Sequence, residues 1–114
     1  MKLQRIRYQD LNAKAKEMFN FHKASAKLAD YGFTTMWLNN DWQGADFLAV
    51  HYDGQTFLKV QLKSRLSFSE KYRNKNLYIC FICDQQDFYL YPHDEVLDFV
   101  ENKISDEKWK KEGS

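Results

Sequence analysis

The residues best suited to chemistry in this chain are an aspartate, a glutamine and a lysine within the segment Gly44–Arg65. Asp46 stands near the start of the segment, and Gln61 and Lys63 stand near its end. Between them lies Asp53-Gly54, a dipeptide strongly favoured in two-residue hairpin turns. Because a hairpin brings its two open ends together, the sequence predicts that the three polar side chains lie close to one another.

The register of this predicted hairpin follows from counting residue pairs outward from the turn. If Tyr52 pairs with Gln55, Asp46 pairs with Gln61. Lys63 lies two residues beyond Gln61 and therefore points to the same side, because side chains alternate along a strand. The other side of this strand carries apolar residues, Leu58, Val60 and Leu62. We expect one face of the hairpin to carry the chemistry and the other to join the core.

These residue types suit the hydrolysis of a phosphodiester. The reaction needs hard oxygen ligands for a divalent cation, Mg²⁺ or Mn²⁺, and a group that orients or deprotonates the attacking water. Asp46 could supply a carboxylate, Gln61 an amide oxygen and Leu62 a backbone carbonyl. Lys63 would position the water and offset the charge that develops on the phosphoryl group.

Gly44-Ala45-Asp46 followed by Gln61-Leu62-Lys63-Ser64-Arg65 resembles the signature of the PD-(D/E)xK nuclease superfamily. This superfamily includes many restriction enzymes and the small Holliday-junction resolvases of archaea, and the resemblance covers Ala15 to Ile82. It implies a restriction-endonuclease-like fold and metal-dependent endonuclease activity on DNA. A helix before the first strand often contributes a glutamate to the metal site in this superfamily, and Glu17 is the matching residue.

The chain departs from the superfamily signature at two positions. Ala45 stands where the nominal motif has Pro, a position that is loosely kept across the superfamily. Gln61 replaces the usual acid, which leaves Asp46 and Glu17 as the only charges of the expected metal site. Some restriction enzymes of the superfamily use Gln here. Three functions therefore stay open: an active nuclease, a catalytically degenerate module of the same fold that binds nucleic acid, and a protein-interaction domain that uses the acidic C-terminal part.

A second set of candidate residues lies in the connection after the hairpin. It combines basic, polar and aromatic side chains: Ser64, Arg65, Lys71, Tyr72, Arg73 and Lys75. Residues 59–75 carry six Lys or Arg and one acid, although the whole chain has a net charge of only +1. Basic groups bind phosphates and aromatic rings stack on bases, so the set is expected to contact DNA. The alternative for each residue is a solvated, charged loop.

The elements that position these residues follow from periodicity and turn signals. Leu11–Tyr31 is predicted as an amphipathic helix, with Asp10 as N-cap and Gly32 as C-terminal stop. Asn39–Gly44 is expected to be a polar turn. Lys63–Asn76 is a basic connection with room for a short helix. The predicted strands are Phe33–Leu38, Ala45–Tyr52, Gln55–Leu62, Leu77–Cys83 and Phe88–Tyr91.

The expected architecture is a single α/β domain over residues 1–102. It is a restriction-endonuclease-like, three-layer fold with a central mixed sheet of about five strands and a helix at each end. The C-terminal helix is predicted over His93–Asn102, and the charged tail Lys103–Ser114 is expected to fray. Such a small domain could address both strands of DNA as a homodimer.

Composition narrows the class of protein further. With 114 residues, of which 44% are hydrophobic and 17% aromatic, the chain suits one compact domain. Its apolar runs are far shorter than the roughly 20 residues that span a bilayer, so a soluble, cytoplasmic protein without a membrane partner is expected. Cys80 and Cys83 should lie on opposite faces of one strand as buried thiols, not as metal ligands.

Each candidate also has an ordinary structural role open to it. Asp46 could cap a turn, while Gln61 and Lys63 could belong to the solvated face of a strand. Glu17 could pair with Lys14 on the helix surface. Aromatic residues outside the motif are expected in the core or at its rim: Trp37, Trp42, Tyr89 and Tyr91. Only the metal-site hypothesis requires Asp46, Gln61, Lys63 and Glu17 to converge.

Overall fold

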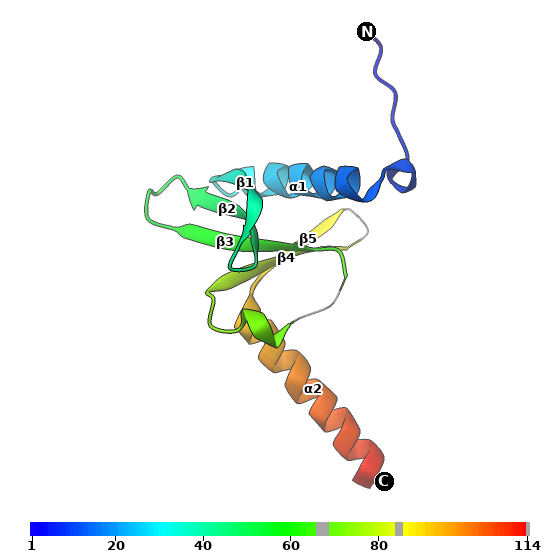
Figure 1. The fold of residues 1–114 in the computed structure, drawn as a ribbon, viewed down its shortest axis with the longest axis vertical. Helices are drawn as coiled ribbons and strands as arrows, with labels where there is room; N and C mark the ends of the chain where they lie inside the picture. The colour runs from blue at the N-terminus through cyan, green and yellow to red at the C-terminus, as the bar shows by residue number, and fades with distance from the viewer. Residues whose placement is uncertain (66–68, 84–85, 114) are drawn as a thin grey trace.

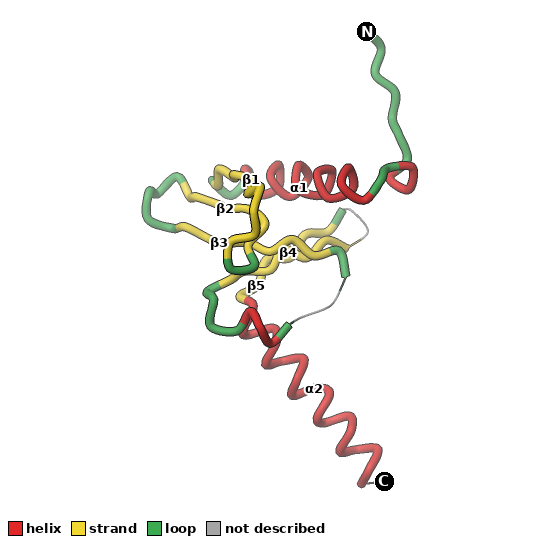
Figure 2. Tube along the Cα trace, viewed as in Figure 1, coloured by secondary structure: helices red, strands yellow, loops and turns green. Residues whose placement is uncertain are grey.

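The fold is α/β, with a five-stranded mixed sheet and two helices (Figure 1). The structure is a computed structural model that describes residues 1–65, 69–83 and 86–113, with side chains up to residue 103. Helix α1 (Ala13–Ala29) lies along one face of the sheet, and helix α2 (His93–Gly113) begins directly after the last strand and runs away from the sheet (Figure 2). The α/β class, the mixed sheet and the helix near each end agree with the prediction.

The N-terminus of α1 is capped by Asn12, whose Oδ1 accepts a hydrogen bond from the amide of Ala15 at 2.8 Å. The prediction of Asp10 as N-cap is therefore wrong. Asp10 ends the short 3₁₀ helix η1 (Tyr8–Asp10) and pairs with Arg7 at 3.0 Å instead. A left-handed Gly32, with φ of +89°, follows the helix as expected.

The five strands lie side by side in sequence order. They are β1 (Phe33–Trp42), β2 (Ala45–His51), β3 (Phe57–Lys63), β4 (Leu77–Cys83) and β5 (Asp87–Pro92). β3 and β4 run parallel, and the other neighbours run antiparallel. The connection between the two parallel strands contains the 3₁₀ helix η2 (Glu70–Tyr72).

Strand β1 is longer than predicted and takes in most of the segment expected to be a polar turn. It ends at Trp42, which pairs with Ala45 across a two-residue turn. Both turn residues, Gln43 and Gly44, have positive φ, the backbone conformation that such tight hairpin turns require. Pairing with β2 thus keeps the polar end of β1 extended, although its composition favours a loop.

The hairpin of β2 and β3 has the predicted register. Phe47 pairs with Val60 and Ala49 with Leu58, and the same register continued by one pair places Asp46 opposite Gln61. The turn, however, is wider than predicted. The last backbone hydrogen bond runs from the amide of His51 to the carbonyl of Thr56, so residues 52–55 form the loop.

Asp53 organises this loop through its carboxylate. Oδ1 accepts hydrogen bonds from the amides of Gln55 and Thr56 at 2.7 and 2.8 Å, and Oδ2 accepts one from the Thr56 hydroxyl at 2.8 Å. The bond from the Thr56 amide is the largest of the causes that hold the pKa of Asp53 far below its ordinary value of 3.8.

Asp53→Ala is expected to lower the melting temperature at neutral pH, because three hydrogen bonds of the loop are lost. The pKa of Asp53 is lowered by folding, so its stabilisation is complete above the ordinary value of 3.8 and is lost as the pH falls toward the folded pKa. The melting curves of wild type and variant should therefore converge in acid. A difference in melting temperature that stays constant down to pH 2.5 would contradict this role.

The core lies between α1 and the sheet. Phe47, Ala49 and Val60 have no exposed surface and pack against one side of the helix, formed by Phe21, Ala24 and Leu28. On the other side of the sheet, α2 contacts β4 and β5, and its Leu97 is buried. This helix runs to Gly113 and so takes in most of the expected tail, whose side chains from 104 on lie outside the described residues. Neither helix, as far as the structure describes it, has an apolar stretch long enough to cross a membrane.

Candidate active site

Asp46, Gln61 and Lys63 belong to the sheet face that points away from α1. Their neighbours Phe47 and Val60 pack against the helix, and side chains alternate along each strand. Regular pairing of β2 with β3 ends at Phe47 and Val60, so the three polar residues stand where the two strands leave their ladder. The hairpin brings the two ends of the motif together, as the register predicts.

The Asp46 carboxylate is held by the backbone of the opposite strand. Its Oδ2 accepts a hydrogen bond of 2.7 Å from the amide of Leu62, whose carbonyl is the expected third metal ligand. The turn-capping role considered for Asp46 is taken by Asp41 instead, since Asp41 Oδ2 accepts from the amide of Gly44 at 3.3 Å. The hydrogen bond from Leu62 therefore fixes the Asp46 side chain across the open end of the hairpin, where β2 begins and β3 ends.

Charges from three other elements act on this carboxylate. Burial raises the pKa of Asp46 above its ordinary 3.8, and the hydrogen bond from Leu62 opposes this. The negative charges of Glu17 and Asp41 raise the pKa further, and the positive charge of Lys63 lowers it. Glu17 and Lys63 thus both lie near enough to Asp46 to influence its ionisation, although these two residues are 46 positions apart in the sequence.

Gln61 is the buried member of the group, with 7% of its surface exposed. Its Nε2 donates a hydrogen bond of 3.1 Å to the carbonyl of Gly44, which determines the amide orientation because the flipped amide would place two acceptors together. Oε1 is buried and has no partner within the described residues. An unpaired buried acceptor costs about 1–3 kcal/mol, so this oxygen is available to a bound cation or donor.

Glu17 lies on the exposed surface of α1 and forms an ion pair with Lys14 at 3.0 Å. The ion pair with Lys14 that was considered as the ordinary structural role of Glu17 is therefore present. Glu17 acts on Asp46 only through its charge. Among the described residues, no three His, Cys, Asp or Glu side chains lie close enough together to hold a metal ion. A role for Glu17 as metal ligand stays a prediction, and it requires the side chain to leave Lys14.

A divalent cation fits the remaining donors by their chemistry. Asp46, Gln61 and the carbonyl of Leu62 offer three oxygen atoms, the type of ligand that Mg²⁺ and Mn²⁺ prefer. The raised pKa of Asp46 and the unpaired Oε1 of Gln61 both indicate a place where positive charge would be stabilising. Only Asp46 among the three ligands is charged, so we expect modest metal affinity.

Gln61→Glu tests whether this position faces a cation. Without metal, the variant is expected to lose about 2–5 kcal/mol of stability, because a buried carboxylate replaces the donor that binds the Gly44 carbonyl. With Mg²⁺ or Mn²⁺, the second carboxylate should strengthen binding, and the metal should raise the melting temperature more than in wild type. Thermal unfolding with and without each metal measures both effects.

Gln61→Met is the matched control, since it keeps the length of the side chain and removes both the amide oxygen and the amide nitrogen. It should abolish any rise in melting temperature that the metal gives the wild type. A metal response that is the same in wild type, Gln61→Glu and Gln61→Met would show that Gln61 binds no cation.

In the connection after β3, some residues are exposed and others contact the rest of the fold. Four of the predicted DNA contacts are exposed, namely Ser64, Arg65, Lys71 and Lys75. Tyr72 instead packs beneath the turn between β1 and β2, where a Cβ on Gly44 would come within 2.6 Å of its ring. The edge of the Tyr72 ring also meets His93, with 6.3 Å between ring centroids. Stacking of Tyr72 on a base would require it to leave this position.

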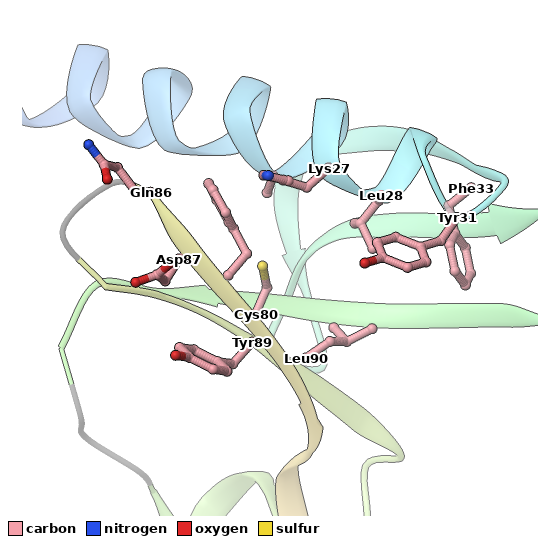
Figure 3. A pocket seen from close by; sticks show the side chains of 11 residues that line it. Lys27, Leu28, Tyr31, Phe33, Cys80, Gln86, Asp87, Tyr89 and Leu90 are labelled. Atoms are coloured by element: carbon pink, nitrogen blue, oxygen red, sulfur yellow. The ribbon is translucent and has the colours of Figure 1, made fainter.

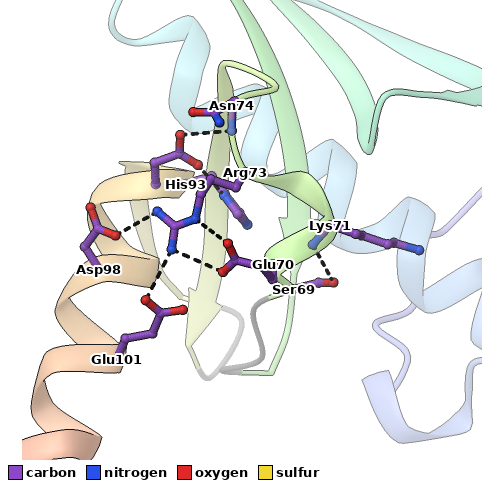
Figure 4. A network of polar contacts seen from close by, with 9 residues as sticks. Ser69, Glu70, Lys71, Arg73, Asn74, His93, Asp98 and Glu101 are labelled. Atoms are coloured by element: carbon purple, nitrogen blue, oxygen red, sulfur yellow. Dashed lines mark hydrogen bonds and ion pairs between the residues drawn. The ribbon is translucent and has the colours of Figure 1, made fainter.

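Arg73 is the centre of an ion-pair network that joins the connection to α2 (Figure 4). Its guanidinium binds Glu70 at 2.6 Å, Asp98 at 2.8 Å and Glu101 at 3.2 Å. The hydrogen bonds that the guanidinium donates to Glu70 and Asp98 raise the pKa of Arg73. With three carboxylates around it, this guanidinium is better placed to anchor α2 than to bind a phosphate.

A separate cavity of about 520 Å³ opens between the C-terminal half of α1 and β5 (Figure 3). Its walls include Leu28, Tyr31, Phe88 and Leu90, so it is mainly apolar. Cys80 lies in it as a buried thiol, as predicted, and burial raises its pKa to about 12. The cavity is on the α1 side of the sheet and is not part of the site around Asp46.

The sequence pattern did not single out Asp41, although it shapes the site in two ways. It accepts the amide of Gly44 in the turn and adds negative charge near Asp46. The available signal was an Asp three residues before a Gly, which is common in turns of every kind.

Comparisons of the chain with models of known protein families, with curated proteins and with solved structures find no match. The class shown is therefore an α/β fold with a mixed five-stranded sheet. The activity has to be argued from the geometry of Asp46 and its neighbours.

Proposed function

We propose that this protein is a metal-dependent endonuclease of the PD-(D/E)xK type, with a restriction-endonuclease-like fold, that hydrolyses phosphodiester bonds in DNA. The observation that carries the proposal is the setting of Asp46. Its carboxylate is bound to the Leu62 amide across the hairpin, and the charges of Glu17 and Lys63 both act on it. The order of elements, a helix followed by the antiparallel strands β1 to β3, also matches what the resemblance implies.

In this proposal, Asp46, Gln61 Oε1 and the Leu62 carbonyl hold Mg²⁺ or Mn²⁺, and Glu17 joins them if it leaves Lys14. The bound ion would stabilise negative charge on the phosphoryl group and lower the pKa of a bound water. Lys63 follows Gln61 on the same face of β3, which brings its ammonium to the same end of the hairpin. There it donates a hydrogen bond to the attacking water and offsets the charge of the transition state.

The second candidate function is a module that binds DNA without cleaving it. Two observations favour it: position 61 has a neutral side chain, and the described residues contain no cluster of three metal-binding acids, histidines or cysteines. Such a module would bind DNA through the basic connection after β3, and its binding would not depend on the charge of Asp46.

Cleavage of supercoiled plasmid and of branched DNA, in Mg²⁺, in Mn²⁺ and in EDTA, tests the proposed function. We expect nicking with either metal and none in EDTA. If the wild type cuts neither substrate with any metal, the nuclease proposal fails. Salt-sensitive DNA binding that persists in Asp46→Asn would then identify the binding module. A sedimentation measurement with and without DNA tests the homodimer that two-strand cleavage would suit.

Lys75→Ala and Arg73→Ala separate DNA contact from structural support. Lys75 is exposed, so its loss should weaken DNA binding and reduce the slope of log affinity against log salt by about 0.9, the value for one phosphate contact. Arg73→Ala removes the same charge from the network with Glu70, Asp98 and Glu101. It should leave the slope unchanged and lower the melting temperature. Fluorescence anisotropy over a salt series, together with thermal melts, measures both quantities, and a reduced slope in Arg73→Ala would contradict this assignment.

A further inference from the structure

The outer face of β5 carries two exposed tyrosines that the core does not use. Tyr89 and Tyr91 are 45% and 44% exposed, and their rings are nearly parallel, with 6.1 Å between centroids and 7° between planes. The residues that alternate with them, Phe88 and Leu90, pack against the hydrophobic core. The strand is thus held from the α1 side, while both rings project from the other side. The two rings thus lie at the rim of the sheet, one of the two positions expected for them, and not in the core.

Cross-strand pairing places the two rings in line with the candidate active site. Lys63 pairs with Phe81, and Phe81 pairs with Tyr89. In the next row of the same face, Gln61 pairs with Ile79, and Ile79 pairs with Tyr91.

Paired residues on neighbouring strands share a face and are separated by about 4.8 Å, so the backbones of Lys63 and Tyr89 lie roughly 10 Å apart. That distance equals roughly three nucleotides of a stacked strand at about 3.4 Å each. The tyrosines therefore stand within a few nucleotides of a phosphate bound at Lys63. Of the two residues between the tyrosines and the site, Ile79 is buried and Phe81 is half-buried, so the apolar surface between Lys63 and Tyr89 is offered by Phe81.

Charge near the tyrosines favours bases over phosphates. Strand β5 has no Lys or Arg, and it begins with the exposed Asp87. It leads into the first turn of α2, which carries Asp94 and Glu95. Phosphates would be repelled by these acids, whereas the uncharged face of a nucleobase would not. A flat, exposed aromatic ring is the usual partner of an unpaired base, and in a duplex the bases are already stacked on each other.

We propose that Tyr89 and Tyr91 form a stacking platform for unpaired nucleobases of the strand whose phosphate lies at Asp46 and Lys63. The preferred substrate is then DNA with a single-stranded or locally unpaired segment beside the cleavage site. This inference rests on the proposed function for the position of the phosphate.

The test is the affinity of the full chain for a fluorescent single-stranded oligonucleotide and for a duplex of the same length, measured in EDTA so that nothing is cut. Tyr89→Ala combined with Tyr91→Ala should weaken single-strand binding by about tenfold or more, the loss typical of removing an aromatic stacking partner. Duplex binding should change by less than about threefold. Tyr89→Phe combined with Tyr91→Phe keeps the rings and should bind as wild type does. Tyr52→Ala, which removes an exposed ring from the hairpin loop, is the matched control.

Two results would overturn the platform: unchanged single-strand affinity in the double alanine variant, or an equal loss for single strand and duplex. The Phe variants keep the test decisive if the alanine variant does not fold, because a loss of single-strand affinity in folded Phe protein would also contradict stacking. Cleavage by the wild type is read separately with Mg²⁺ or Mn²⁺. If the tyrosine variants show no stacking but the wild type cuts DNA, the platform is wrong and the proposed nuclease function stands. If the wild type does not cut DNA but the tyrosine variants show stacking, the nuclease function is wrong and the platform stands.

Discussion

Asp46→Asn is expected to reduce DNA cleavage by at least about 100-fold, the scale of losing one electrostatic contact with the transition state. The variant should nevertheless be as stable as the wild type at neutral pH, or more stable. The amide oxygen of Asn can still accept the hydrogen bond from Leu62, so the mouth of the hairpin keeps its geometry. What disappears is the negative charge that would hold a cation.

The stability half of this prediction follows from the pKa of Asp46. Burial is the largest cause that raises this pKa above 3.8, and Glu17 and Asp41 add to the effect. A carboxyl group whose pKa is raised by folding contributes stability at low pH and loses it as the pH rises through the folded pKa. Asn does not ionise. As the pH rises from the ordinary pKa of 3.8 through the raised pKa of folded Asp46, the melting temperature of Asp46→Asn relative to wild type should therefore rise. Above the folded pKa, the difference should level off.

Thermal melts of both proteins over a pH series, in the absence of divalent metal, check this result. Asp46→Ala is the control for the hydrogen bond, since it leaves the Leu62 amide without its acceptor and should cost about 1–3 kcal/mol. If Asp46→Asn cuts DNA as fast as wild type, Asp46 holds no essential cation. If it melts well below wild type at neutral pH, the ionised carboxylate is stabilising, and the reading of its charge environment is wrong.

The register of the hairpin was predictable because it depends on local signals. Asp53-Gly54 marks the turn, and alternation of apolar and polar residues in β3 decides which side faces the core. The loop proved wider than two residues, yet Asp46 still falls opposite Gln61, because a loop of residues 52–55 keeps the same centre as one of residues 53–54. The motif could therefore be placed correctly even though the turn was not.

Features that depend on distant partners were not predictable in the same way. Arg73 looks like any basic loop residue in the sequence, and only the fold brings Asp98 and Glu101 beside it. Tyr89 and Tyr91 alternate with core residues as any half-buried strand would. Their exposure depends on which face of β5 packs against α1 and the core, which pattern and propensity do not determine.

Lys63→Ala is the second variant with a large expected effect. Lys63 lies on the face of Asp46 and Gln61, and its charge acts on the Asp46 carboxylate. Removing it should take away the group that orients water and offsets transition-state charge, with a loss of at least about 100-fold in rate. Lys59 offers a matched control on the same strand and the same face. Its Nζ binds Gln43 at 3.1 Å and lies over the ring of Trp42, away from the carboxylate.

The initial rate of plasmid nicking in Mg²⁺ or Mn²⁺, compared between wild type, Lys63→Ala and Lys59→Ala, tests the nuclease site most directly. Both variants lose one positive charge from β3, so a general weakening of DNA binding should affect them alike. We predict a loss of at least about 100-fold in Lys63→Ala and less than about threefold in Lys59→Ala. Equal rates in Lys63→Ala and wild type, or equal losses in the two variants, would contradict a catalytic centre at Asp46, Gln61 and Lys63.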